Sequence, residues 1–164
     1  MALLREWSMT RVMNRSETLS NSSREYPSRP LVGVGALIVE ANRIVLVRRG
    51  APPSKGEWSI PGGLIHVGET LRDAVVRESF EETGLSVEPG DLVELVERIV
   101  RDHQGTIRYH YVIADFLCRV SGGELRPGSD APDAKWVPSE QLEEMGLADI
   151  TLKVVRAAFE QSPV

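Results

Sequence analysis

The chain has 164 residues, of which 41% are apolar, and this suits one domain large enough for a proper hydrophobic core. Its formal net charge of −5 argues against non-specific binding to nucleic acid, and no apolar run approaches the roughly 18 residues that a membrane-spanning helix needs. We therefore expect a cytoplasmic enzyme that acts on a small molecule, with no nucleic-acid or membrane partner; a homodimer stays open.

The first 30 residues differ in composition from the rest of the chain. Arginines alternate with serine and asparagine, and no strong hydrophobic periodicity continues beyond about Met13. Because such a segment cannot bury much apolar surface, residues 1–30 are predicted to be a flexible extension and residues 31–164 a single domain. A true start at Met9 or Met13 is an open alternative.

From residue 31 onward, strand patterns alternate with helical ones. Residues 31–40 and 43–49 are rich in β-branched side chains and predict a hairpin turned at Ala41-Asn42. The remaining predicted elements are a short strand at 57–60, a helix at 71–83, paired strands at 92–101 and 107–120, a short strand at 134–137, a short helix at 139–145 with Ser139 as its N-cap, and an amphipathic helix at 150–161. This order predicts an α/β fold with a mixed sheet and helices on both faces. The only cysteine, Cys118, follows a strand pattern and is predicted to be a buried structural thiol.

The helix at 71–83 has well-marked ends and an unusual charge pattern. Thr70 and Asp73 form a capping box, and Gly84 suits the left-handed residue after the last turn. At about 100° per residue, Glu78 and Glu82 share one side of the helix with Glu81 beside them, and they continue a line begun by the apolar residues Leu71, Ala74 and Val75. Crowded acids near a helix C-terminus disfavour the helix, whereas a bound divalent cation would reverse that penalty.

A solvated acidic face, with Arg77 paired to Glu81, is the plain alternative for these glutamates. The flanking residues favour a site, because Pro61-Gly62-Gly63 allows a ligand to approach the backbone closely. The whole segment resembles the Nudix box, with matching residues at Gly63, Glu69, Arg77, Glu78, Glu81, Glu82, Gly84 and Leu85. The one departure from the pattern is the serine at position 79, where the family usually has a small or aliphatic residue. Serine is small enough to pack there.

The Nudix resemblance implies an α/β/α sandwich and a hydrolase that uses Mg²⁺ or Mn²⁺ to cleave a pyrophosphate bond. It implies that Glu78 and Glu82 are metal ligands and that Glu81 is a ligand or an outer partner. The family pattern also implies a ligand role for the Gly63 carbonyl, a supporting role for Glu69 and an orienting role for Arg77. A further acid from a late loop is expected, with Asp130 as the candidate and Asp133 or Glu140 as substitutes.

Residues outside the box suggest how a substrate is held. Arg48 and Arg49 end a strand and could grip phosphates, Trp58 could stack on a base or pack in the core, and Gly62 could approach the ligand. The segments EWSIPGG and DAKWVPSEQL look most similar to the ADP-ribose pyrophosphatase-like branch of the family. The resemblance favours ADP-ribose or a nucleoside diphosphate sugar as substrate, with a MutT-like triphosphate pyrophosphohydrolase or a non-catalytic ligand-sensing domain as alternatives.

Overall fold

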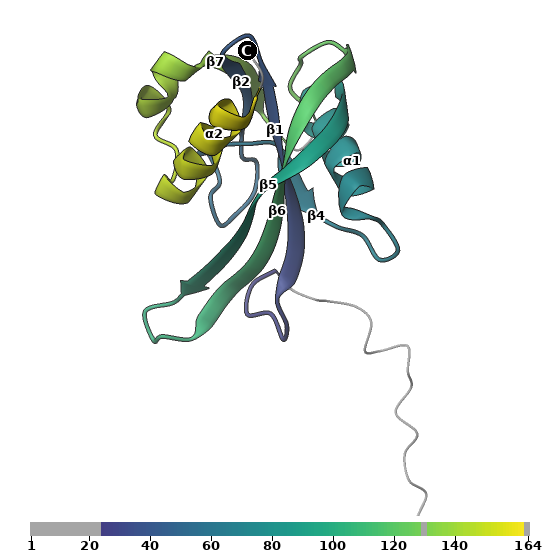
Figure 1. Cartoon of the computed structure of the whole chain (residues 1–164). Helices are drawn as coiled ribbons and strands as arrows, with labels where there is room; N and C mark the ends of the chain where they lie inside the picture. Colours follow the sequence, from purple (N-terminus) through teal and green to yellow (C-terminus); the bar gives the residue numbers. More distant parts are fainter. Residues whose placement is uncertain (1–23, 129–130, 163–164) are drawn as a thin grey trace, which may run out of the picture.

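The protein is described from a computed structural model that covers residues 24–128 and 131–162. Its elements, shown in Figure 1, are β1 (Leu31–Glu40), β2 (Arg43–Arg48), β3 (Trp58–Ser59), β4 (Gly62–Leu64), α1 (Leu71–Thr83), β5 (Leu85–Arg101), β6 (Ile107–Gly123), β7 (Asp133–Pro138), the 3₁₀ helix η1 (Ser139–Met145) and α2 (Asp149–Gln161). Within the described part, none of the helices is long and apolar enough to cross a membrane.

The strands form a mixed sheet in which β1 is central. The strand order is β3-β2-β1-β6-β5, with β4 paired to β1 and β7 paired to β2. Strands β1 and β6 run parallel, from the pair Leu31–Tyr111 to the pair Ile38–Cys118, and the other pairings are antiparallel. The β1–β2 hairpin turns at Ala41 and Asn42, whose φ angles of 46° and 59° suit a tight two-residue turn. Both the mixed sheet and this hairpin were predicted and are confirmed.

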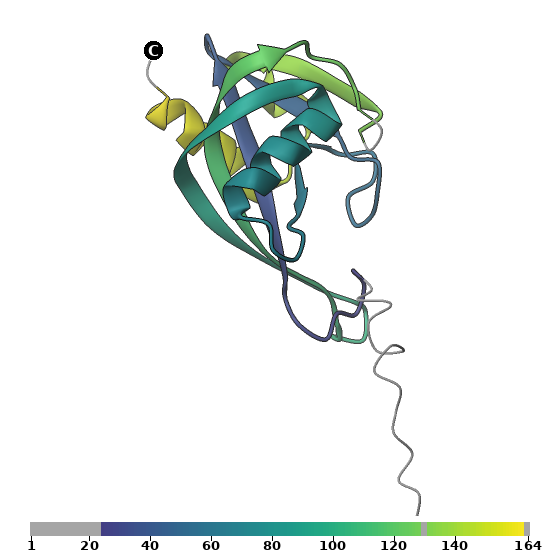
Figure 2. The ribbon, with the colours of Figure 1, turned by 90° about the vertical axis from the view of Figure 1, so that its right-hand side faces the viewer.

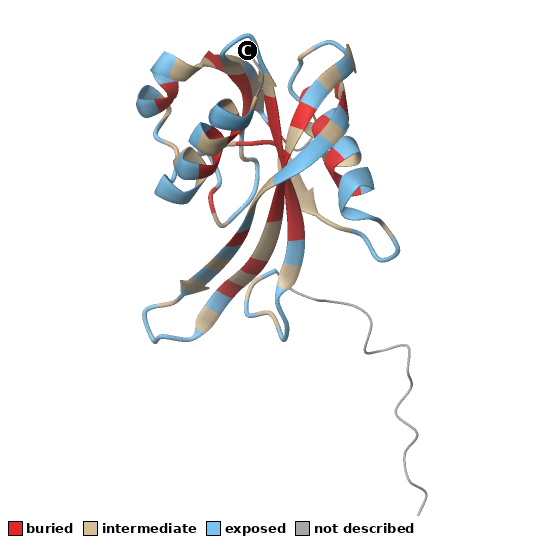
Figure 3. Ribbon diagram, viewed as in Figure 1, coloured by how far each residue is buried: buried red, intermediate tan, exposed pale blue. Residues whose placement is uncertain are grey.

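The two long helices cover opposite faces of the sheet, as Figure 2 shows for α1 in front and α2 behind. On one face, Ala74 and Val75 of α1 pack into a cluster with β1 and β6; on the other, Val154 and Val155 of α2 pack into a cluster with β1, β2 and β5. The buried residues follow the central strands between these helices (Figure 3). The α/β/α sandwich is therefore confirmed. Cys118 lies in the first cluster, and burial raises the pKa of its thiol to about 12, as expected for a structural cysteine.

Strand β5 is longer than predicted. Its first half pairs irregularly with β6, and its sequence therefore lacks a regular strand pattern. The strand begins at Leu85, directly after the helix-ending Gly84, rather than at residue 92. Pro89 and Gly90 resemble a turn in the sequence, but register shifts between Pro89 and Leu92 absorb them within the edge strand, where a missing N–H is tolerated.

Two local expectations about helices are corrected. Leu71 is 36% exposed and so lies outside the buried face of α1, which is formed by Ala74, Val75, Ser79 and Thr83. Ser139 is the first residue of η1 rather than its cap, because Pro138 takes the N-cap position without a side-chain hydrogen bond.

Two residues of the predicted extension, residues 1–30, make contacts with the rest of the chain. The Tyr26 N–H donates to the Arg108 carbonyl (2.8 Å), and the Tyr26 hydroxyl donates to Asp102 (3.2 Å). Glu25 also forms an ion pair with Arg108. Glu25 and Tyr26 therefore contact the β5–β6 hairpin, and the part of the extension before residue 24 lies outside the described residues.

Candidate active site

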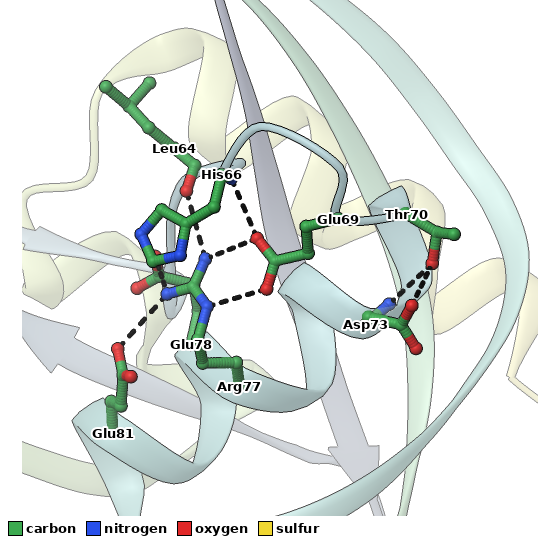
Figure 4. Close-up of polar contacts among 8 residues, drawn as sticks. All are labelled: Leu64, His66, Glu69, Thr70, Asp73, Arg77, Glu78 and Glu81. Atoms are coloured by element: carbon green, nitrogen blue, oxygen red, sulfur yellow. Dashed lines mark hydrogen bonds and ion pairs between the residues drawn. The ribbon is translucent and has the colours of Figure 1, made fainter.

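The acidic side of α1 faces the glycine strand β4. Strand β4 pairs with β1 through Val34–Gly63 and Gly35–Gly62, and this holds the two glycines beside the helix. Helix α1 starts at a real cap: Thr70 Oγ1 accepts the Asp73 N–H at 3.2 Å, and the Thr70 hydroxyl donates to the Asp73 carboxylate at 2.6 Å (Figure 4). It ends at Gly84 with a φ of 70°, as the sequence predicted.

Arg77 is the centre of the polar network in Figure 4. Its guanidinium makes a two-pronged contact with Glu69, at 2.7 and 2.8 Å, and donates to the Leu64 carbonyl at 3.1 Å. The same group contacts Glu78 at 2.7 Å and Glu81 at 3.2 Å. The local Arg77–Glu81 pair considered from the sequence is therefore the longest of its contacts, and the closer ones fix the loop before α1.

The electrostatics of this network keep both partners charged. Hydrogen bonds from Arg77, supported by the His66 N–H, lower the pKa of the Glu69 carboxyl to about 2. Glu69 and Glu78 in turn raise the pKa of Arg77 above its ordinary value. A charged, planar guanidinium with paired contacts has a defined orientation, so it can hold the neighbouring carboxylates in place.

Glu78 and Glu82 close on the glycine pair. A Cβ added to Gly63 would stand 2.3 Å from Glu78 Oε1, so only glycine leaves room for this carboxylate. The Gly62 N–H donates to Glu82 Oε2 at 2.9 Å. The Glu78 side chain is 14% exposed and Glu82 is half-buried, whereas the Glu81 side chain is 45% exposed.

The ladder between β1 and β4 decides which glycine carbonyl faces the acids. Bonds from the Ala36 N–H to Pro61 and from the Ile65 N–H to Val32 make Val34–Gly63 the next bonded pair, so the Gly63 carbonyl points toward β1. Gly62 is oriented the other way, as its N–H bond to Glu82 demonstrates. The N–H and C=O of one strand residue point to the same side in an antiparallel ladder, so the Gly62 carbonyl lies on the side of the acids.

The donor set fits a hard divalent cation. Three carboxylates and a backbone carbonyl are oxygen ligands of the kind that Mg²⁺ prefers, and the missing side chain of Gly63 lets the Glu78 carboxylate lie against β4. Within the described ranges, no three acidic, histidine or cysteine groups already surround a common point. In this conformation the acids are held by Arg77 and by the Gly62 N–H.

A cleft of about 1200 Å³ begins at these acids and extends along the sheet. Arg48, Arg49 and Trp58 line it, as do Gly62 and Gly63. Arg48 donates to the Gly56 carbonyl at 2.9 Å, and Trp58 carries Lys135 over its ring at 4.6 Å while also packing on the core.

Of the three acids predicted from the late loop, one lies outside the described residues and one lines the cleft. Asp130 lies outside the described residues. Asp133 lines the cleft, whereas Glu140 is exposed on η1 and does not appear in the cleft wall.

Asp115, an acid in the wall of the cleft, is a site residue that was not predicted from the sequence. It is 4% exposed, and its Oδ1 has no hydrogen-bond partner among the described residues. Burial, together with the negative charge of Glu94, raises the pKa of Asp115 to about 7. A lone acid between apolar residues in the middle of a strand, in the run Val-Ile-Ala-Asp-Phe-Leu, is the signal that could have identified it.

Comparison with known proteins identifies related chains. The NUDIX domain family model matches residues 29–158. The ADP-ribose pyrophosphatase of Methanocaldococcus jannaschii is 38% identical over 113 residues, which cover 69% of this chain and 64% of that protein. The chain spans 29% of the length of another relative, a putative nudix hydrolase of Caenorhabditis elegans.

Solved structures share the fold. A MutT NUDIX hydrolase from Burkholderia pseudomallei is 31% identical with a TM-score of 0.67, covering 82% of this chain and 99% of that one. The NUDIX domain of Shewanella oneidensis NrtR, solved in complex with ADP ribose, is 25% identical with a TM-score of 0.66, covering 91% of this chain and 99% of that one.

Proposed function

Since the chain belongs to the NUDIX family and is a Nudix hydrolase, we propose that it cleaves the pyrophosphate bond of ADP-ribose or a related nucleoside diphosphate sugar in a reaction that needs Mg²⁺ or Mn²⁺. The observation that carries this proposal is the closure of Glu78 and Glu82 on the glycine strand beside the Arg77 network. The substrate class is supported by the relative named ADP-ribose pyrophosphatase and by the NUDIX domain solved with ADP ribose.

Glu78, Glu82 and the Gly62 carbonyl are proposed to hold the cation, with Glu81 as a further ligand or outer partner. The Gly62 carbonyl replaces the predicted Gly63 carbonyl in this role, because the Gly63 carbonyl points toward β1. A bound divalent cation would neutralise phosphate charge and lower the pKa of water near the scissile bond. Asp133 is the described candidate for the late-loop acid.

The remaining site residues are proposed to position the glutamates and to bind the phosphates of the substrate. Arg77 acts through the glutamates: its paired contact with Glu69 fixes the guanidinium, which then fixes Glu78 against β4. Arg48 and Arg49 stand in the cleft wall with the charge and geometry that suit phosphate oxygens. The domain that performs this reaction is proposed to start before residue 31, because Glu25 and Tyr26 already contact the β5–β6 hairpin.

A panel of substrates with Mg²⁺ or Mn²⁺ tests the proposal. ADP-ribose should yield AMP and a ribose phosphate, so inorganic phosphate appears only after phosphatase treatment. A triphosphate would instead release free pyrophosphate, which an added pyrophosphatase converts to phosphate. Turnover that is far more efficient on dNTPs than on every diphosphate-linked compound would favour the MutT-like alternative. The 31% identity to a MutT NUDIX hydrolase supports that alternative. Equal rates with and without chelator would refute the metal requirement.

A further inference from the structure

Three residues on neighbouring strands form a row across the sheet, from Gly62 beside the acids of α1 to the buried acid Asp115. Gly35 on β1 pairs with Gly62 on β4 and also with Asp115 on β6. Neighbouring strands lie roughly 4.8 Å apart, so Asp115 stands about 10 Å across the sheet from Gly62. A nucleotide with its phosphates at Gly62 can therefore place its base near Asp115.

Apolar side chains line part of the cleft near Asp115. A Cβ added to Gly35 would stand 2.1 Å from Asp115 Oδ1 and 2.6 Å from Ile60 Cδ1, so these two side chains fill the room above the glycine. The cleft beside them is lined by the branched side chains of Val96, Ile113 and Val154. Such walls suit a planar heteroaromatic ring, whereas a sugar would need several polar groups.

A buried acid with an unpartnered oxygen is costly unless a ligand completes its hydrogen bonds. We propose that Asp115 binds the edge of the substrate's nucleobase and selects a base that offers one donor and one acceptor, as adenine does. This inference rests on the proposed function in one respect, that the substrate is a nucleotide.

The hydrogen-bonding capacity of the carboxyl explains the choice of base. Desolvation favours the protonated acid, which presents one O–H donor and one carbonyl acceptor side by side. Adenine presents the complementary pair, an exocyclic amino group beside a ring nitrogen.

Equilibrium binding tests the proposal without turnover. AMP and purine riboside 5′-monophosphate, which lacks the 6-amino group, are titrated into the full chain by calorimetry in the presence of Mg²⁺. Because loss of one good hydrogen bond corresponds to about a tenfold change in affinity, AMP should bind the wild-type protein about ten times more tightly. Asp115→Leu should bring this ratio to about one.

Asp115→Asn is the matched variant, because an amide also offers one donor and one acceptor and should keep most of the preference. The proposal is overturned if wild type binds both nucleotides equally, if Asp115→Leu keeps the ratio, or if Asp115→Asn loses it as fully as the leucine variant. Thermal melting checks folding, and Asp115→Ala replaces the leucine variant if that one does not fold. Failure to hydrolyse ADP-ribose would refute the proposed function but leave this binding test intact.

Discussion

Replacing Asp115 by asparagine should remove a pH-dependent loss of stability. The acid's pKa rises from an ordinary value of 3.8 to about 7 in the folded protein, a difference of about 3 pH units. At about 1.4 kcal/mol per unit, ionisation of Asp115 costs the folded state up to about 4 kcal/mol. Its burial, at 4% exposure, makes solvent screening small.

The sign follows from where each state holds the proton. Between about pH 4 and pH 7 the unfolded chain has lost the proton while the folded chain keeps it, so this group's contribution to stability falls as pH rises through that window and is lowest above about pH 7. Asp115→Asn cannot titrate. The variant should therefore equal wild type near pH 4 and exceed it by about 2–4 kcal/mol at pH 8.

Urea unfolding of both proteins from pH 4 to pH 8 measures this difference, and effects of other groups cancel in the subtraction. Glu94→Gln is the matched control: it keeps Asp115 but removes the smaller, electrostatic cause of the shift, so it should reduce the pH dependence only slightly. A difference between wild type and Asp115→Asn that stays flat with pH, or that favours wild type at pH 8, would refute a buried, largely protonated acid.

The remaining predictions concern the acids, the arginine and the N-terminal residues. Glu78→Gln and Glu82→Gln should each lower kcat by about a hundredfold or more in steady-state assays with Mg²⁺, because each removes charge from the proposed metal site, and calorimetry should find Tm unchanged or higher. A large fall in Tm for both would contradict the proposed role. Arg77→Lys keeps the charge but not the two-pronged contact with Glu69, so kcat should fall about tenfold or more with little change in KM. An unchanged kcat would show that this two-pronged contact is not needed for activity. Deleting residues 1–28 should lower Tm by a few degrees, because it removes contacts with the β5–β6 hairpin, whereas deleting residues 1–23 keeps those contacts; identical melting of both truncations would contradict this.

Local chemistry made α1 predictable. The Thr70 cap and Gly84 each act on backbone groups within one turn, so the sequence was sufficient to place both ends of the helix. The spacing of Glu78 and Glu82 on one helical side was sufficient for the same reason.

Contacts between distant segments were not predictable from periodicity. The Arg77–Glu69 contact depends on how the loop after β4 folds back, and the sequence pointed instead to the nearer Glu81. The position of Asp115 near the candidate site depends on the pairing of β4, β1 and β6, which join segments far apart in the sequence. The early half of β5 was missed because its irregular pairing is a property of the partner strand as well as of Pro89 and Gly90.

Gly35 also constrains how this protein can change its selectivity. Any side chain at position 35 would occupy the place of the Asp115 carboxyl, with 2.1 Å between its Cβ and Asp115 Oδ1. Gly35→Ala alone should expel the acid from its position, while the same change together with Asp115→Ser leaves room for both side chains. A side chain at position 35 therefore requires a smaller residue at position 115 in the same variant.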